Sequence, residues 1–155
     1  FEPGRYIVGN TGVLVASVLY RKKSGGKNFL IINAGMNDLV RPTLYEAYHD
    51  IVPVKHSNQP KVTVDVVGPI CETGDFLGKD RQLPWLGQGE LLAAKCAGAY
   101  GFAMSSQYNS RLRAAEVMVE GKKFHLIRCR EQYQDLVMNE TGTGLKNTSI
   151  GDTLA

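Results

Sequence analysis

Short runs of β-branched and apolar residues, ended mostly by glycine, proline or polar residues, recur along most of this chain of 155 residues. The first two runs, residues 13–20 and 28–33, flank Gly25-Gly26, and this arrangement predicts a β-hairpin. Several short strands at such spacing favour a closed or nearly closed antiparallel barrel, because closure removes exposed strand edges. Further strands are expected at residues 62–67, 90–96, 99–104, 114–120 and 123–129.

Two short helical segments interrupt the strand pattern. Residues 42–50 open with Pro42, which suits the first position of a helix because an N–H there would be unpaired in any case. Residues 131–137 form the second segment, and residues 120–122 predict a tight turn between the last two strands. Residues 141–155 are rich in Gly, Thr, Ser and Asn, so we expect a flexible or docked tail. The residues therefore predict a mainly β fold with two short helices.

Charge and cysteine content exclude several classes of protein. The net charge of +3 comes from scattered basic residues, whereas a nucleic-acid surface needs a cluster or stripe. The three cysteines form no Cys-x-x-Cys pair and the three histidines are isolated, so we expect no metal site and reduced thiols of a cytoplasmic protein. No apolar run approaches the roughly 20 residues of a membrane span. The chain opens without Met and without a signal peptide, so we expect it to begin inside a longer polypeptide.

Two polar segments in the first third of the chain carry residues suited to binding anions. In residues 2–5, Gly4 lets backbone N–H groups approach a phosphate and Arg5 adds charge, although Pro-Gly is also a common turn. Arg41 and Tyr45 are four residues apart, so they share a face of a helix that begins near residue 42. A guanidinium beside a phenol can clamp a carboxylate, or it can simply stack on the aromatic ring.

Two further segments follow predicted strands. Cys71 and Glu72 lie where a strand ends and the chain turns, so the thiol is either exposed and reactive or buried and inert. In residues 97–101, small residues flank Tyr100. Glycines in such a place permit close approach by a ligand or another backbone, or they relieve crowding at a barrel corner.

The sequences of these segments, and their order along the chain, resemble motifs of the fold-type III decarboxylases that use pyridoxal 5′-phosphate (PLP), specifically the diaminopimelate decarboxylase branch. The similarity covers roughly residues 1–140, and several dispersed motifs make it specific. Leu112 departs from the pattern, because the family has proline there. The matching stretches are Glu-Pro-Gly-Arg at 2–5, Asn-Asp-Leu-Val-Arg-Pro-Thr-Leu-Tyr at 37–45, Gly-Pro-Ile-Cys-Glu-Thr-Gly-Asp at 68–75, Gly-Ala-Tyr-Gly at 98–101, Ser-Ser-Gln-Tyr-Asn at 105–109 and Arg-Ala-Ala-Glu-Val at 113–117.

The resemblance implies four cofactor-binding residues. Glu2 would pair with the pyridinium nitrogen of PLP and keep the ring protonated, which makes PLP a stronger electron sink. Gly4 and Arg5 would face the phosphate, and Arg5 would also reach the substrate. Tyr100 would contact both PLP and substrate. The lysine that forms a Schiff base with PLP is not in this chain, so the chain alone is expected to be inactive.

The resemblance also implies how a substrate with an amino-acid group at each end is recognised. Arg41 and Tyr45 would hold the distal carboxylate, and Glu72 would hold the distal ammonium. Cys71 would deliver a proton to the α-carbon after CO₂ leaves. Cys71 and Glu72 would act in trans, in the active site of the partner subunit of a homodimer. A site with Arg41 for a carboxylate and Glu72 for an ammonium favours diaminopimelate over ornithine or lysine, which lack a distal carboxylate.

The architecture implied is the C-terminal, Greek-key-like antiparallel β-barrel domain of such an enzyme, at residues 13–140. Residues 1–12 would be the last segment of the N-terminal TIM-like barrel, which is otherwise absent. The implied reaction converts meso-diaminopimelate to L-lysine and CO₂ in the cytoplasm. Two alternatives stay open: a non-catalytic β-barrel that regulates or binds a partner, and a decarboxylase for another basic amino acid or a carboxylated polyamine.

Overall fold

The computed structural model describes residue 1 and residues 3–140, so the expectations for Glu2 and for the tail at residues 141–155 lie outside the described part. The chain forms two compact units, residues 1–113 and a second unit that begins at Ala114. The first contains α1 (Gly4–Val8), the 3-10 helix η1 (Gly9–Thr11), β1 (Leu14–Ser24), β2 (Lys27–Ile32), α2 (Arg41–Tyr45), β3 (Ile51–Pro53), β4 (Lys61–Val67), β5 (Phe76–Pro84), β6 (Leu91–Ala94), and the 3-10 helices η2 (Phe102–Met104) and η3 (Tyr108–Ser110). The second contains β7 (Glu116–Glu120), β8 (Lys123–Arg128) and α3 (Tyr133–Val137).

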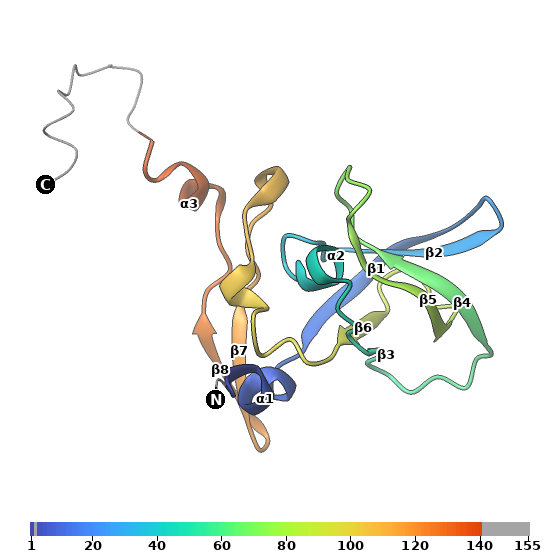
Figure 1. Cartoon of the computed structure of the whole chain (residues 1–155), viewed down its shortest axis with the longest axis horizontal. Helices are drawn as coiled ribbons and strands as arrows, with labels where there is room; N and C mark the ends of the chain where they lie inside the picture. The colour runs from blue at the N-terminus through green and yellow to red at the C-terminus, as the bar shows by residue number, and fades with distance from the viewer. Residues whose placement is uncertain (2, 141–155) are drawn as a thin grey trace, which may run out of the picture. The chain divides into compact units, whose positions relative to one another are not determined.

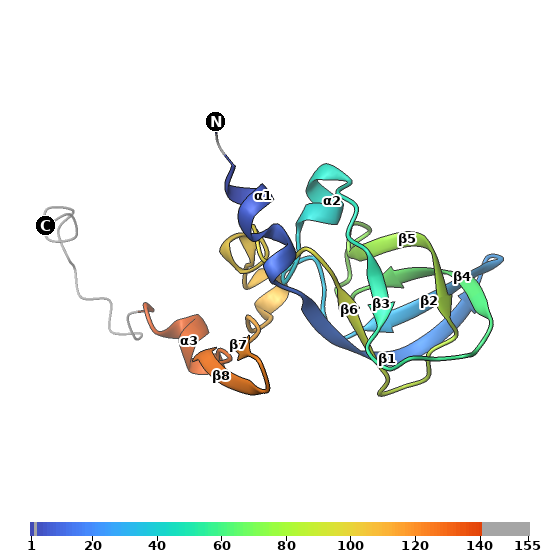
Figure 2. The same ribbon diagram turned by 90° about the horizontal axis from the view of Figure 1, so that it is seen from below.

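The six strands of the first unit form one sheet in the order β3-β6-β1-β2-β4-β5 (Figure 1). Neighbours are antiparallel except β2 and β4, which run parallel. A parallel pair needs a long crossover, and residues 33–60, which contain α2 and β3, supply it. The outer strands β3 and β5 contact each other, so the sheet curves into a nearly closed barrel (Figure 2). The predicted mainly β, barrel-like fold is confirmed, with one parallel pair in an otherwise antiparallel order.

The hydrophobic core lies inside the curved sheet, because side chains two residues apart in a strand point to the same face. In β1 the buried pair is Ala16 and Val18, and in β2 it is Leu30 and Ile32. All members of this cluster lie between Ala16 and Ala94, so the core belongs to the first unit. The other buried members are Ala34, Leu39, Ile51, Val64, Val66, Leu77, Leu83, Leu86, Leu92 and Ala94.

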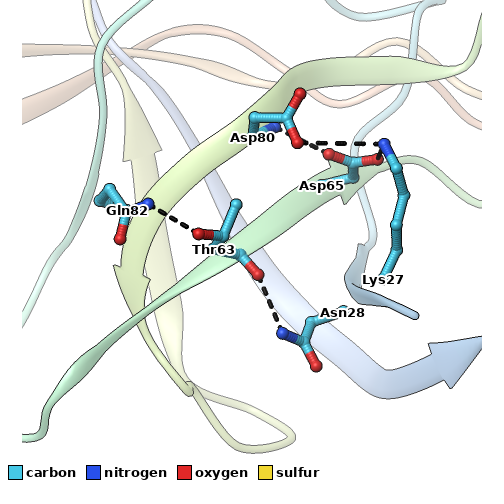
Figure 3. Close-up of polar contacts among 6 residues, drawn as sticks. All are labelled: Lys27, Asn28, Thr63, Asp65, Asp80 and Gln82. Atoms are coloured by element: carbon cyan, nitrogen blue, oxygen red, sulfur yellow. Dashed lines mark hydrogen bonds and ion pairs between the residues drawn. The ribbon is translucent and has the colours of Figure 1, made fainter.

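Strand β5 was not among the sequence predictions, because Lys79-Asp80-Arg81 interrupts its apolar pattern. A polar network across β2, β4 and β5 includes Asp80 (Figure 3). The buried carboxylate of Asp65 accepts hydrogen bonds from the Asp80 N–H, at 2.7 Å, and from Lys27 Nζ, at 2.9 Å. The hydrogen bond from Lys27 to Asp65, and then the charges of Asp65 and Asp80, raise the pKa of Lys27.

Residues 99–104 were expected to form a strand, and this prediction is wrong. Cys96 and Tyr100 both have φ of 58°, in the left-handed region, so the chain cannot stay extended after β6. The chain turns at residues 98–101 and enters η2, where the Ser105 N–H donates to the Phe102 oxygen at 2.9 Å. Tyr100 therefore lies on a turn rather than within a strand.

The second unit contains the predicted hairpin and the second predicted helix. Gly121, at the turn between β7 and β8, has φ of 61°, which suits a tight turn. β7 and β8 form a two-stranded sheet of their own, which corrects the expectation that they extend the barrel. A strand pattern predicts which face is apolar but not which strand is the partner. α3 begins with a capping box, in which the Gln132 N–H donates to the Asp135 carboxylate at 2.6 Å.

Candidate functional site

Arg41 lies beside two tyrosine rings. It is the first residue of α2 and is only 9% exposed. Its guanidinium carbon lies 5.4 Å from the centre of the Tyr45 ring and 5.5 Å from the centre of the Tyr100 ring. The predicted helix over residues 42–50 is shorter than expected, because Glu46 adopts a left-handed conformation with φ of 53° and α2 ends at Tyr45. It still brings Arg41 and Tyr45 together, and the fold adds Tyr100 from a distant turn. None of the ion pairs among the described residues involves Arg41, so no described carboxylate pairs with its charge.

The turn that carries Tyr100 packs against the segment that follows α1. The Gly98 N–H donates to the Gly9 oxygen at 3.0 Å, and the Ala97 N–H donates to the Gly12 oxygen at 2.9 Å. A Cβ on Gly98 would lie 2.2 Å from the Val8 oxygen, so only glycine fits. Close approach of another backbone thus explains this glycine. The consequence is that Tyr100 is fixed next to the segment that begins with Gly4 and Arg5.

Gly4 and Arg5 open α1 and are both exposed. A Cβ on Gly4 would meet no heavy atom within 4 Å, so the space beside it is open. No hydrogen bond or ion pair occupies the Arg5 guanidinium among residues 3–140. An open glycine, a free guanidinium and an exposed tyrosine ring fit a phosphate and an aromatic ring, as the predicted cofactor requires. Glu2 lies outside the described residues.

Cys71 and Glu72 lie on an exposed loop between β4 and β5. Of the two alternatives that the sequence left open, the structure shows an exposed thiol. The Glu72 carboxylate accepts the Gly74 N–H at 3.3 Å and the Tyr108 hydroxyl at 3.4 Å. Among the described residues, neither side chain makes a hydrogen bond or ion pair with Arg41, Tyr45 or Tyr100. The structure thus presents two separate groups, the Arg41–Tyr45–Tyr100 cluster and the Cys71–Glu72 loop.

Three polar residues that hold the loops together were not assigned a role from sequence. Asn37 is 1% exposed, and its Oδ1 accepts the Arg111 Nε–H at 3.1 Å. Arg111 Nη2 also donates to the Asn33 oxygen at 2.6 Å. Asp75 is 4% exposed and accepts backbone hydrogen bonds on both carboxylate oxygens. The only signal in the sequence was that Asn37 lies in the polar segment of Arg41, and Asp75 in that of Cys71.

A pocket of about 200 Å³ lies between α2, the residues that follow it, and β5. Glu46, Lys79 and Arg81 are among its lining residues, and none of the predicted site residues lines it. No group of three His, Cys, Asp or Glu side chains within residues 3–140 is placed to hold a metal ion. In the same part of the chain, no helix has the length and hydropathy to cross a membrane.

Comparison with known proteins gives one family and many relatives. Residues 5–98 match the family described as pyridoxal-dependent decarboxylase, C-terminal sheet domain. Diaminopimelate decarboxylase from Aquifex aeolicus is 57% identical over 136 residues, which are 88% of this chain and 32% of the relative. The enzyme of the same name from Vibrio cholerae is 56% identical over 136 residues, again 88% and 32% of the two chains. The chain thus spans about a third of the length of these relatives.

Solved structures agree with the sequence relatives. A crystal structure from Aquifex aeolicus matches with a TM-score of 0.85 and 55% identity, over 86% of this chain and 33% of that chain. Diaminopimelate decarboxylase from Helicobacter pylori complexed with L-lysine matches with a TM-score of 0.81 and 46% identity, over 86% and 33%. Lysine/ornithine decarboxylase from Vibrio vulnificus, at 23% identity and a TM-score of 0.65, shares the fold over 71% of this chain and 30% of that chain.

Proposed function

The chain belongs to the pyridoxal-dependent decarboxylases, as their C-terminal sheet domain, and on this basis we propose that it is part of an enzyme that converts meso-diaminopimelate to L-lysine and CO₂. The observation that carries the proposal is the buried Arg41, which lies beside two tyrosine rings without a carboxylate partner in the described residues. The high identity to relatives named diaminopimelate decarboxylase supports the same substrate. Residues 1–12 would end the preceding barrel, and residues 13–140 would form the C-terminal domain.

The substrate has an amino-acid group at each end, and only one end reacts. Arg41 and Tyr45 would bind the carboxylate of the other end, because a guanidinium forms two parallel hydrogen bonds with a carboxylate. Glu72 would bind the ammonium of that end. Lysine and ornithine have no distal carboxylate, so binding them would leave the buried Arg41 unpaired.

Cys71 is the proposed proton donor. Its S–H would protonate the α-carbon after the carbon–carbon bond to the departing CO₂ breaks, and a thiolate would be left behind. The exposed loop gives the thiol access to a second protein surface. Because the loop makes no described polar contact with the Arg41–Tyr45–Tyr100 cluster, we propose that Cys71 and Glu72 complete the active site of the partner subunit in a homodimer.

The proposed cofactor is PLP, which when bound supplies an electron sink for the breaking carbon–carbon bond. Gly4 and Arg5 would hold its phosphate, Tyr100 would contact its ring and the substrate, and Glu2 would pair with its ring nitrogen. The lysine that carries it would lie on the preceding barrel. A cytoplasmic location is part of the proposal, and the three free cysteines are in keeping with a reducing compartment.

Mixing two defective variants tests this assignment in the full-length enzyme. One variant carries Cys71→Ala, and the other lacks the PLP-binding lysine. If Cys71 acts in trans, each mixed dimer contains one intact site and one site with both defects. We therefore expect activity on meso-diaminopimelate to return after the variants are co-refolded or co-expressed, as measured by CO₂ release.

The mixing experiment has a clear opposite outcome. If Cys71 served its own subunit, both sites of every mixed dimer would be defective and no activity would return. Co-expression of each variant with itself is the control for residual activity. Full activity of the Cys71→Ala homodimer would remove this residue from the proton-donor role altogether.

A further inference from the structure

The carboxylate of Asp75 connects the Cys71–Glu72 loop with the segment that leads into α2. One oxygen accepts the Ile70 N–H, one residue before Cys71, at 2.6 Å. The other accepts the Met36 N–H, from the segment that leads into α2, at 2.7 Å. The Asp75 backbone oxygen also accepts the Gly68 N–H at 2.9 Å. One buried side chain thus fixes both the start of the loop and the approach to α2.

Two glycines leave room for this carboxylate. A Cβ on Gly68 would lie 2.3 Å from Asp75 Oδ2, and a Cβ on Gly35 would lie 2.7 Å from Asp75 Oδ1. Both distances are shorter than any tolerated contact, so a side chain at either position would displace the carboxylate. The close fit indicates that the Asp75 side chain has little freedom to move.

Two additional hydrogen bonds hold the exposed half of the loop. The Thr43 hydroxyl, on α2, donates to the Gly74 oxygen. The Tyr108 hydroxyl donates to the Glu72 carboxylate. Inside the loop, the Asp75 N–H donates to the Glu72 oxygen at 3.0 Å, and the Glu72 N–H donates to the Ile70 oxygen at 2.9 Å. The loop is therefore connected to the helix that carries Arg41 and Tyr45.

We propose that Asp75 is a positioning residue. It holds Cys71 and Glu72 in the position and orientation that proton delivery and ammonium binding require. This inference rests on the proposed function. A carboxylate can accept both backbone N–H groups at once. An asparagine offers one oxygen and one NH₂ group, so one of the two N–H donors would face another donor. The loop would then shift, even though the side chain keeps its size.

Asp65 supplies a matched control in the same sheet. It is likewise buried, at 6% exposure, and it accepts a backbone N–H from Asp80 and a second hydrogen bond from Lys27 (Figure 3). It makes no hydrogen bond to the Cys71–Glu72 loop. Asp65→Asn therefore makes the same chemical change in a buried, hydrogen-bonded carboxylate that does not hold the loop.

The test compares Asp75→Asn and Asp65→Asn in the full-length, PLP-loaded enzyme. Because Glu72 binds substrate and Cys71 delivers the proton, we expect Asp75→Asn to raise KM and lower kcat together, with kcat/KM falling about tenfold to a hundredfold. A purely structural defect reduces the fraction of active enzyme, so it lowers kcat and leaves KM unchanged. Asp65→Asn is expected to keep the wild-type KM. Equal KM values for the two variants would overturn the proposal.

A second pair of variants covers the case in which Asp75→Asn does not fold. Thr43→Val removes the hydroxyl that binds the Gly74 oxygen, and Thr43→Ser keeps it. We expect a raised KM for the valine variant and a KM near wild type for the serine variant. Wild-type KM in both would contradict the inference that anchoring of this loop controls substrate binding.

Hydrogen exchange gives a readout that needs no activity. The amides of residues 68–76 are expected to exchange faster in Asp75→Asn than in the wild type, and at the wild-type rate in Asp65→Asn.

A wild-type enzyme that is inactive on meso-diaminopimelate would overturn the proposed function and, with it, the role of Asp75 toward that substrate. An active wild type with unchanged exchange and unchanged KM in Asp75→Asn would overturn the role of Asp75 alone.

Discussion

Replacing Cys71 with alanine in the full-length enzyme is expected to slow decarboxylation of meso-diaminopimelate by about 10²- to 10⁴-fold. That range is what a positioned general acid contributes, and the alanine variant has no proton to give. Binding of PLP should be unaffected, because the residues proposed to hold the cofactor lie elsewhere in the fold. Steady-state turnover and the cofactor absorbance, measured on the same sample, check both parts.

Two other cysteines provide matched controls for this prediction. Cys96 and Cys129 are also free and exposed, so Cys96→Ala and Cys129→Ala remove the same group from other places. Both variants should keep wild-type turnover. A Cys71→Ala variant that turns over as fast as these two would show that another group delivers the proton.

Replacing Arg41 with alanine is expected to raise KM for meso-diaminopimelate and to lower kcat/KM by about 10²- to 10³-fold. The physical reason is the loss of a bidentate, charge-assisted contact worth about 3–4 kcal/mol, at about 1.4 kcal/mol per tenfold change. Arg41→Lys should fall between alanine and wild type, because an ammonium keeps the charge but loses the planar fork. Initial rates over a range of substrate concentration give both constants.

The control for Arg41 is a second arginine that stacks on a tyrosine. The guanidinium carbon of Arg81 lies 3.9 Å from the centre of the Tyr48 ring, and Arg81 lines the pocket between α2 and β5. Arg81→Ala removes a similar stack, so it reports the loss of packing without the loss of the substrate contact. If Arg41→Ala and Arg81→Ala had the same KM, the distal-carboxylate role of Arg41 would be wrong.

Local patterns predicted those parts of the fold that depend on neighbouring residues. The hairpin of β1 and β2 follows from two apolar runs around Gly25-Gly26, and its strands pair in antiparallel register. α2 follows from a proline near its start, and the spacing of Arg41 and Tyr45 predicted that they share a face. The exposed loop at Cys71 follows from a strand that ends at glycine and proline.

Features that depend on contacts between distant segments could not be predicted in this way. β5 exists although its centre is charged, because Asp65 of another strand accepts the Asp80 N–H. Residues 99–104 have the composition of a strand, but Tyr100 adopts a left-handed conformation where its turn packs against residues 8–12. The role of Asp75 depends on a backbone N–H that is 39 positions away in the chain.

The resemblance to a family added the assignment of roles, which the residues alone left open. Without it, Arg41 beside Tyr45 is equally consistent with a simple stack and with a carboxylate clamp. The structure places Tyr100 beside the same guanidinium, 5.5 Å from the ring centre, and pairs no described carboxylate with it.

The most direct test of the central proposal is product formation by the full-length, PLP-loaded enzyme with three substrates: meso-diaminopimelate, L-lysine and L-ornithine. If Arg41 and Glu72 together recognise a second amino-acid group, meso-diaminopimelate will give L-lysine and CO₂. This proposal also predicts rates lower by about 10⁴-fold for the two substrates without a distal carboxylate, because the buried guanidinium would then be unpaired. Comparable CO₂ release from L-lysine or L-ornithine, or none from meso-diaminopimelate, would contradict it.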